Sequence, residues 1–225
     1  MTPEGGRPTA SRDVFVTGGT GYIGSRLIRE LISRGHVVRA LARPGSERRV
    51  PEGASAILGN ALEAESFVHA LRPGDTLVHL VGTPHPSPAK AKEFREIDLP
   101  SVRAAVEAAR RAGASHFVYV SVAQPAPTMR AFVEVRAAGE KAIADANLTA
   151  TLLRPWYVLG PGHRWPLLLV PFYGLAGLLP RLRDGAQRLG LVTLRQMVAA
   201  LVRAVEDPPP AGTVRIVDVP AIRGA

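Results

Sequence analysis

Short apolar runs alternate with stretches of helical spacing along most of the chain. Residues 14–16 are apolar, and residues 22–34 then carry apolar side chains three and four positions apart, which is typical of a helix. Residues 37–41 form a second apolar run and complete a strand–helix–strand unit. The same alternation predicts further strands at residues 54–58, 76–81, 116–122, 149–153 and 213–217. It predicts further helices at residues 63–71, 89–111 with an interruption near Pro100, 133–147 and 193–206.

A glycine-rich turn joins the first predicted strand to the first predicted helix. It reads Thr17-Gly18-Gly19-Thr20-Gly21-Tyr22-Ile23-Gly24. Glycines in such a turn let the backbone bend sharply and approach a pyrophosphate, and the helix N-terminus offers N–H groups to the phosphates. All eight residues are therefore candidates for binding a dinucleotide. A tight turn without a ligand is the alternative.

The glycine spacing, from Gly18 through Gly21 to Gly24, resembles the fingerprint of the extended and atypical short-chain dehydrogenase/reductases. The likeness runs to about residue 162, through Gly59-Asn60-Ala61, residues 77–82, Ser121, Gly139-Glu140, and Arg154-Pro155 with Gly160-Pro161-Gly162. The resemblance implies that Asn60 and Ala61 lie beside the adenine, that Val81 and Gly82 line the ribose or nicotinamide, and that Pro155 lies at the nicotinamide.

The alternation of strands and helices indicates a parallel sheet covered on both faces. We therefore predict an α/β fold, a doubly wound Rossmann-type sheet with a small C-terminal lobe. Residues 1–12 are expected to be a flexible tail and residues 13–155 the dinucleotide-binding domain. Residues 156–225 would form a small lobe for a substrate or partner, packed on the same domain.

The end of the second predicted strand favours NADP(H) over NAD(H). An NAD site usually places a carboxylate there to bind the ribose 2′-hydroxyl. The chain has Arg43 at this point and no carboxylate, and a guanidinium suits a 2′-phosphate. Arg48 or Arg49 would assist. A solvated loop cation is the alternative reading of Arg43.

The family's catalytic pair is replaced. Active members carry a tyrosine four residues before a lysine, and the tyrosine passes a proton to the substrate oxygen. Here Phe132 stands at the tyrosine and Arg136 at the lysine. Phenylalanine has no proton to give, whereas arginine can still hold a ribose hydroxyl or a phosphate. Ser121 keeps the family's serine position, and Asp98 lies about where an asparagine is often found.

Three explanations remain open. Tyr157 or His85 supplies the proton instead, with Ser121 and Tyr157 as the catalytic candidates. Water supplies it, or the protein binds the dinucleotide without redox chemistry. The first two predict a reductase or isomerase of a small apolar substrate. The third predicts a non-catalytic module that stabilises a protein partner or senses the cofactor's redox state, similar to the dehydrogenase-like accessory subunits of respiratory complex I.

Composition adds further constraints on function. The 225 residues carry a formal charge of +9, with a pI near 10.9, but arginines are spread along the chain and lysines are few, so a compositional bias explains the charge and no nucleic-acid partner is expected. Without cysteine or a close grouping of His, Asp and Glu, no metal site is predicted. The polar N-terminus points to a cytoplasmic protein. The apolar run 167–179, flanked by arginines, suggests a pocket wall or, alternatively, a peripheral contact with the inner face of a membrane.

Overall fold

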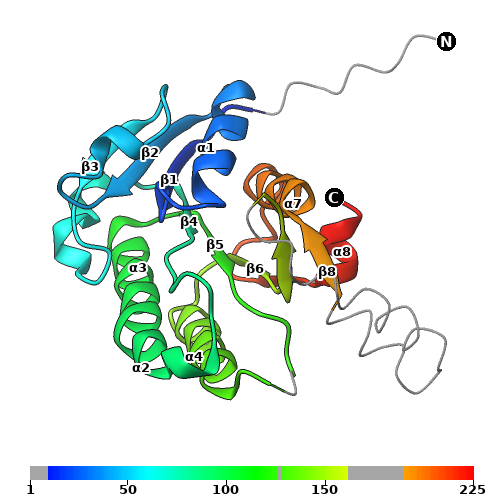
Figure 1. Cartoon of the computed structure of the whole chain (residues 1–225). Helices are drawn as coiled ribbons and strands as arrows, with labels where there is room; N and C mark the ends of the chain where they lie inside the picture. The colour runs from blue at the N-terminus through cyan, green and yellow to red at the C-terminus, as the bar shows by residue number, and fades with distance from the viewer. Residues whose placement is uncertain (1–9, 126–127, 162–189) are drawn as a thin grey trace, which may run out of the picture.

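Seven parallel strands form the main sheet, in the order β3-β2-β1-β4-β5-β6-β9 (Figure 1). The structure is a computed structural model and describes residues 10–125, 128–161 and 190–225. The strands are β1 (Asp13–Thr17), β2 (Val37–Ala42), β3 (Ser55–Leu58), β4 (Thr76–His79), β5 (His116–Val120), β6 (Ala150–Leu153) and β9 (Val214–Val217). Two short strands, β7 (Tyr157–Leu159) and β8 (Leu191–Thr193), pair in parallel as a second sheet.

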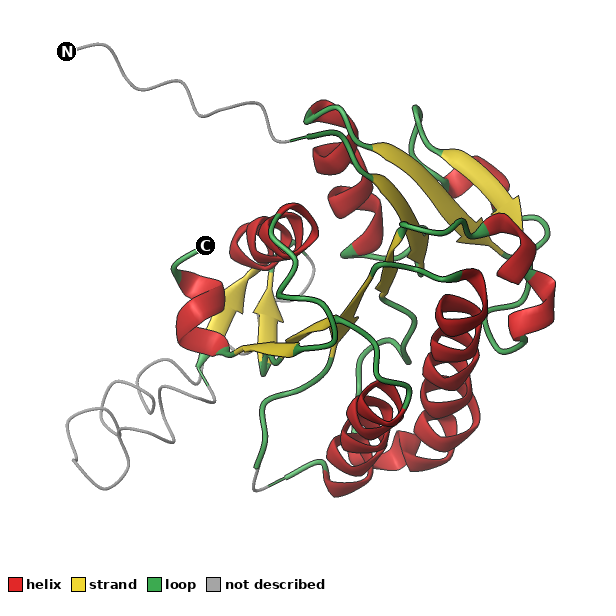
Figure 2. Cartoon of the chain, turned by 180° about the vertical axis from the view of Figure 1, so that it is seen from behind, coloured by secondary structure: helices red, strands yellow, loops and turns green. Residues whose placement is uncertain are grey.

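Helices cover both faces of the main sheet (Figure 2). The longer ones are α1 (Gly24–Ser33), α3 (Leu99–Ala112), α4 (Arg130–Asp145) and α7 (Leu194–Glu206). The shorter ones are α2 (Ala91–Glu93), α8 (Val219–Arg223), η1 (Glu47–Arg49), η2 (Ala64–Ser66), η3 (Val68–Ala70), η4 (Pro88–Lys90) and η5 (Phe94–Asp98). α1 and α7 lie on one face, and α3 and α4 on the other (Figure 1). The predicted doubly wound α/β fold is confirmed.

Alternation along β1 explains the two core layers. Val14 and Val16 belong to the apolar cluster that includes Leu27 of α1 and Met197 of α7. Phe15, which points to the opposite face, belongs to the cluster that contains residues of α3 and α4. All three β1 side chains are fully buried, as expected for a parallel strand with helices on both sides.

Two predicted helices differ in detail. The segment predicted as a helix at 63–71 forms the single turns η2 and η3 instead. The Ser66 hydroxyl competes with helical bonding there, because it donates to carbonyl oxygens of Asn60 and Glu63 and accepts from the Asn60 N–H at 2.9 Å. The long predicted helix 89–111 forms, with the π-helical turn η5 just before Pro100 at the start of α3. Proline lacks the N–H that would continue regular α-helical bonding through this point.

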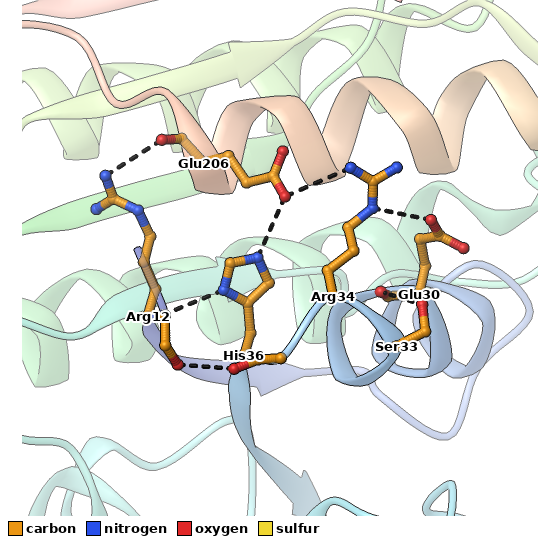
Figure 3. Close-up of polar contacts among 8 residues, drawn as sticks. Arg12, Glu30, Ser33, Arg34, His36 and Glu206 are labelled. Carbon is orange, nitrogen blue, oxygen red and sulfur yellow. Dashed lines mark hydrogen bonds and ion pairs between the residues drawn. The ribbon is translucent and has the colours of Figure 1, made fainter. Parts of the chain in front are cut away.

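A polar cluster fastens the end of α7 to the start of β2 (Figure 3). His36, whose side chain is fully buried, lies between the other members of the cluster. Its Nδ1 accepts a hydrogen bond from the Arg12 backbone N–H at 3.2 Å, and its Nε2 lies 3.3 Å from Oε1 of Glu206. Arg34 approaches the same carboxylate oxygen at 3.5 Å. These contacts hold α7 beside α1, at the edge of the sheet opposite to the glycine turn.

The C-terminal lobe stays a prediction. β9 joins the main sheet beside β6, whereas β7 and β8 stand apart from it. The apolar run 167–179, His163 and the flanking Arg164, Arg181 and Arg183 lie outside the described residues. Within the described part of the chain, no helix has the length and apolar character needed to cross a membrane.

Candidate functional site

The candidate site residues gather at the carboxyl edge of the sheet. Because the seven strands are parallel, the residues that follow them meet at one edge. These residues are Thr17 at the end of β1, Arg43 after β2, Asn60 and Ala61 after β3, Val81 and Gly82 after β4, Ser121 after β5, and Pro155 after β6. The strand order reverses between β1 and β4, and the crevice outside such a switch point is where ligands bind in open α/β sheets.

Two positions of the glycine turn have no room for a side chain. Gly18 has a φ of +76°, and a Cβ on it would lie 2.7 Å from the backbone carbon of Leu80. A Cβ on Gly24 would lie 2.3 Å from the carbonyl oxygen of Gly18. The turn therefore packs backbone to backbone against the end of β4 on one side and against α1 on the other. Any larger residue would displace the turn.

Gly21, the middle glycine of the Gly18–Gly21–Gly24 spacing, faces outward. Gly21 is exposed, and its N–H donates to the Gly18 carbonyl oxygen at 3.0 Å. Among the described residues, the backbone N–H groups of Ile23 and Gly24 make no backbone hydrogen bond, and no side chain caps α1. An uncapped helix N-terminus behind a bare glycine backbone is a cradle that fits a pyrophosphate. The turn thus fits the pyrophosphate of a dinucleotide, the group that the sequence predicted for it.

Exposed arginines follow β2. Arg43 and Arg48 are exposed, and neither makes a hydrogen bond or ion pair with any described residue. Arg49 Nη2 donates to the carbonyl oxygen of Thr20 at 3.4 Å, so η1 reaches the glycine turn. The acidic group of this loop, Glu47, accepts a hydrogen bond from the Gly45 N–H at 3.1 Å. The loop therefore presents cationic groups beside the turn.

Asn60 organises its own loop. Its Nδ2 donates to Glu63 Oε1 at 2.8 Å, and its Oδ1 accepts from the Leu62 N–H at 3.1 Å. Asn60 and Ala61 are both half-buried. A role beside the adenine would therefore use the backbone and the surface of this turn more than the Asn60 amide.

A buried histidine connects the glycine turn to α3. Ser101 Oγ donates to the Asp98 carbonyl oxygen at 2.9 Å, so it accepts from His79 Nε2, which lies 3.3 Å away. His79 Nδ1 is then the acceptor for the Thr17 hydroxyl at 2.8 Å. Burial, with a further contribution from the charge of Arg136, lowers the pKa of His79 to about 3. His79 is a neutral core histidine and cannot serve as a cationic acid at neutral pH.

The low pKa of His79 makes the stability of the fold depend on pH. A histidine with a depressed folded pKa is neutral in the native protein, whereas the unfolded chain takes up a proton below its pKa of about 6.5. Its contribution to stability is therefore lost as pH falls from about 6.5 toward 3. Urea unfolding between pH 6 and pH 4.5 should show that His79→Gln reduces the dependence of the unfolding free energy on pH by about 1 kcal/mol per pH unit.

A matched replacement of the exposed His69, His69→Gln, should leave that dependence unchanged. Equal slopes for the two variants would contradict the assignment of His79. His116, whose pKa burial lowers to about 4, contributes a slope in the same direction and is present in both variants.

An aromatic side chain occupies the position of the family tyrosine. Phe132, near the start of α4, is half-buried, and its ring centroid lies 5.0 Å from that of Phe94. The guanidinium of Arg136 stands over the same ring at 5.0 Å. The position is therefore a packed apolar surface beneath a cation, and its side chain has no proton to transfer.

Arg136, at the family lysine position, is part of a buried ion pair. Its Nη2 lies 2.9 Å from Oδ2 of Asp98, and its Nη1 donates to the Val120 carbonyl oxygen at 3.1 Å. The other oxygen of Asp98 accepts from both the N–H and the hydroxyl of Thr83, each at 2.8 Å. Arg136 is 7% exposed and Asp98 1% exposed. The Arg136 guanidinium is therefore bound by protein groups, and it also lies against Gly82, a residue predicted to line the ribose.

The contact between Arg136 and Gly82 explains why residue 82 is a glycine. A Cβ on Gly82 would lie 2.4 Å from Nη2 of Arg136. Gly82 is exposed and Val81 is half-buried. The sequence drew attention to Asp98 through the family likeness alone, and Thr83 was not identified at all.

The other candidates differ in accessibility. Ser121 is 4% exposed, and its buried hydroxyl has no hydrogen-bond partner among the described residues. Tyr157 is half-buried, and this burial raises the pKa of its phenol. His85 is exposed and has a φ of +49°. Pro155 is buried, and its carbonyl oxygen accepts from the Ala123 N–H at 3.0 Å.

Comparison with known proteins adds to this geometry. Residues 18–163 match the model of a family described as NAD(P)H-binding. The chain is similar to a 3-diazoavenalumate denitrifying reductase of a Streptomyces species, with 32% identity over an alignment that covers 86% of this chain and 72% of that protein. It is also similar to a ceramide reductase of Caulobacter vibrioides, with 27% identity over 198 residues that cover 87% of this chain. The matched region is 61% of that reductase, so this chain spans less than two thirds of its length.

Solved structures share the fold. The Bordetella bronchiseptica enzyme WbmH, crystallised in complex with NAD+, superposes with a TM-score of 0.65 at 21% identity. The alignment covers 87% of this chain and 72% of that one. The glycine turn at residues 18–24 lies at the start of the region that the family model matches.

Proposed function

Because the chain belongs to the NAD(P)H-binding family of short-chain dehydrogenase/reductase-like proteins, we propose that it binds NADP(H) in preference to NAD(H) and acts as a reductase on a small apolar substrate. The observation that carries the proposal is the uncapped N-terminus of α1 behind a turn in which Gly18 and Gly24 leave no room for side chains. Both relatives described above are named as reductases, which supports reduction as the reaction.

Preference for the 2′-phosphate rests on the loop after β2. Arg43 occupies the position where a carboxylate would bind the ribose diol, and its guanidinium is exposed and without an ion-pair partner in the described chain. Arg48 and Arg49 extend the same cationic loop. A guanidinium binds a phosphate through parallel charge-assisted hydrogen bonds, which a ribose hydroxyl cannot offer. The loop therefore complements NADP(H), the nucleotide that carries the 2′-phosphate.

The variant Arg43→Ala tests this preference. We expect the Kd for NADPH to rise about tenfold and the Kd for NADH to change little, because the lost interaction involves the 2′-phosphate. Titration of each nucleotide, followed by its fluorescence, measures both constants. Arg103→Ala, which removes an exposed arginine from α3, is the matched control. A similar loss for NADH and NADPH, or none for either, would count against the assignment.

The chemistry must proceed without the tyrosine–lysine pair. When bound, the nicotinamide supplies a hydride. Phe132 offers a packed apolar surface, and Arg136 is held by Asp98, so neither passes a proton to a substrate oxygen. Tyr157 and Ser121 are the side chains proposed to hold or donate a proton; otherwise water serves. Substrates whose reduction needs little acid assistance are the ones that this site favours.

Single-turnover oxidation of NADPH, measured across a set of apolar carbonyl and conjugated alkene compounds, tests catalysis. Oxidation with at least one compound, slowed by Tyr157→Phe or Ser121→Ala, would support the reductase. The packed Phe132 and the ion pair of Arg136 with Asp98 favour a second function, that of a cofactor-binding module without redox chemistry. Tight NADPH binding with no oxidation of any compound would support the module.

A further inference from the structure

Tyr22 is the residue of the glycine turn that meets the C-terminal elements. Its carbonyl oxygen accepts a hydrogen bond from Arg26 Nη1 at 2.8 Å, and the Arg26 guanidinium stands 4.6 Å from the centroid of its ring. Arg26 thus holds Tyr22 from the side of α1. Tyr22 also directly precedes the uncapped N–H groups of Ile23 and Gly24. Movement of Tyr22 therefore moves the part of the turn that fits a pyrophosphate.

The phenol of Tyr22 meets the backbone of Gly160. A Cβ on Gly160 would lie 2.0 Å from Oη and 3.2 Å from Cζ of Tyr22. The same Cβ would lie 3.2 Å from Cβ of Leu194, the buried first residue of α7. Glycine at position 160 is therefore a packing requirement set by a residue of the glycine turn.

Gly160 directly follows β7, a strand that stands outside the main sheet. Within the described residues, β7 pairs with β8 alone, and β8 leads straight into α7. The Thr193 hydroxyl caps that helix by accepting from the Gln196 N–H at 3.2 Å. The ladder of the seven-stranded sheet does not fix the position of β7. Gly160, directly after β7, packs against Tyr22 of the glycine turn.

We propose that Gly160 is a positioning residue, through which β7 and the C-terminal elements set the affinity of the glycine turn for the dinucleotide. This inference rests on the proposed function, because it concerns the same site. Coupling between two sites is reciprocal. If a substrate or partner shifts β7 and thereby changes the affinity for the dinucleotide, the dinucleotide changes the affinity for that substrate or partner by the same factor.

The test compares NADPH affinity in the variants Gly160→Ala, Tyr22→Phe and the double variant. In Gly160→Ala the added methyl must displace the phenol, and we expect the Kd for NADPH to rise about tenfold. Removing Oη relieves the contact at 2.0 Å and leaves Cζ at 3.2 Å, so the double variant should return to within about twofold of Tyr22→Phe. Gly224→Ala is the control, because its added Cβ meets nothing closer than 3.7 Å.

Two results would overturn the proposal: an unchanged Kd in Gly160→Ala, or a double variant as weak as Gly160→Ala. If Gly160→Ala does not fold, the wild-type chain carries the test through amide exchange. Saturating NADPH should then slow exchange at residues 157–159, and unchanged exchange there would overturn the proposal. A wild-type chain that binds neither NADPH nor NADH refutes the proposed function itself, before any variant is measured.

Discussion

Replacing Gly21 with valine is expected to weaken NADPH binding at least about 100-fold while leaving the fold intact. Gly21 is exposed, and a Cβ on it would meet one neighbour, the Gly18 carbonyl oxygen at 3.1 Å. The substitution therefore adds bulk on the open side of the turn, where a pyrophosphate must approach the backbone closely. A hundredfold loss corresponds to about 2.7 kcal/mol, the scale of a few charge-assisted hydrogen bonds.

The matched control is Gly224→Val, at the far end of α8, where an added Cβ would have ordinary contacts. Nucleotide titration gives the Kd of both variants, and thermal unfolding followed by circular dichroism shows whether each is folded. A folded Gly21→Val variant that binds NADPH as tightly as the control would remove the glycine turn from the site.

Replacing Asp98 with alanine is expected to destabilise the chain by about 3–5 kcal/mol. The substitution leaves the buried Arg136 guanidinium without its partner and removes the acceptor for the Thr83 N–H and hydroxyl. Urea denaturation at neutral pH measures the change in unfolding free energy.

Lys141 and Asp145 provide a matched exposed pair on α4, at 2.8 Å. Asp145→Ala should change stability by less than about 0.5 kcal/mol, because solvent screens an exposed ion pair. Similar losses in the two variants would mean that the Asp98–Arg136 pair is not the buried, organising interaction described here.

The glycine turn could be predicted because its chemistry is written in one continuous segment. The spacing of Gly18, Gly21 and Gly24, placed between an apolar run and a helical pattern, was enough to identify it. The alternation of strands and helices was equally readable, since each buried strand of a parallel sheet is an apolar run. The one predicted helix that did not form, at residues 63–71, was lost to hydrogen bonds of a single serine hydroxyl, Ser66.

Interactions between distant segments could not be predicted. Asp98 and Arg136 are separated by 38 positions, and nothing in either segment marks them as a buried pair. The exchange of tyrosine and lysine for Phe132 and Arg136 was visible in the sequence, but its consequence depends on Phe94 and Asp98, which only the fold brings close. The strands β7 and β8 are three residues long and lie beside a proline-rich segment, so periodicity could not reveal them.

Calorimetric titration of the wild-type chain with NADPH and then with NADH tests the central claim most directly. The account predicts saturable binding of one nucleotide per chain, with NADPH bound more tightly than NADH. Binding of neither nucleotide would contradict a dinucleotide site at the glycine turn, and tighter binding of NADH would contradict the role given to Arg43.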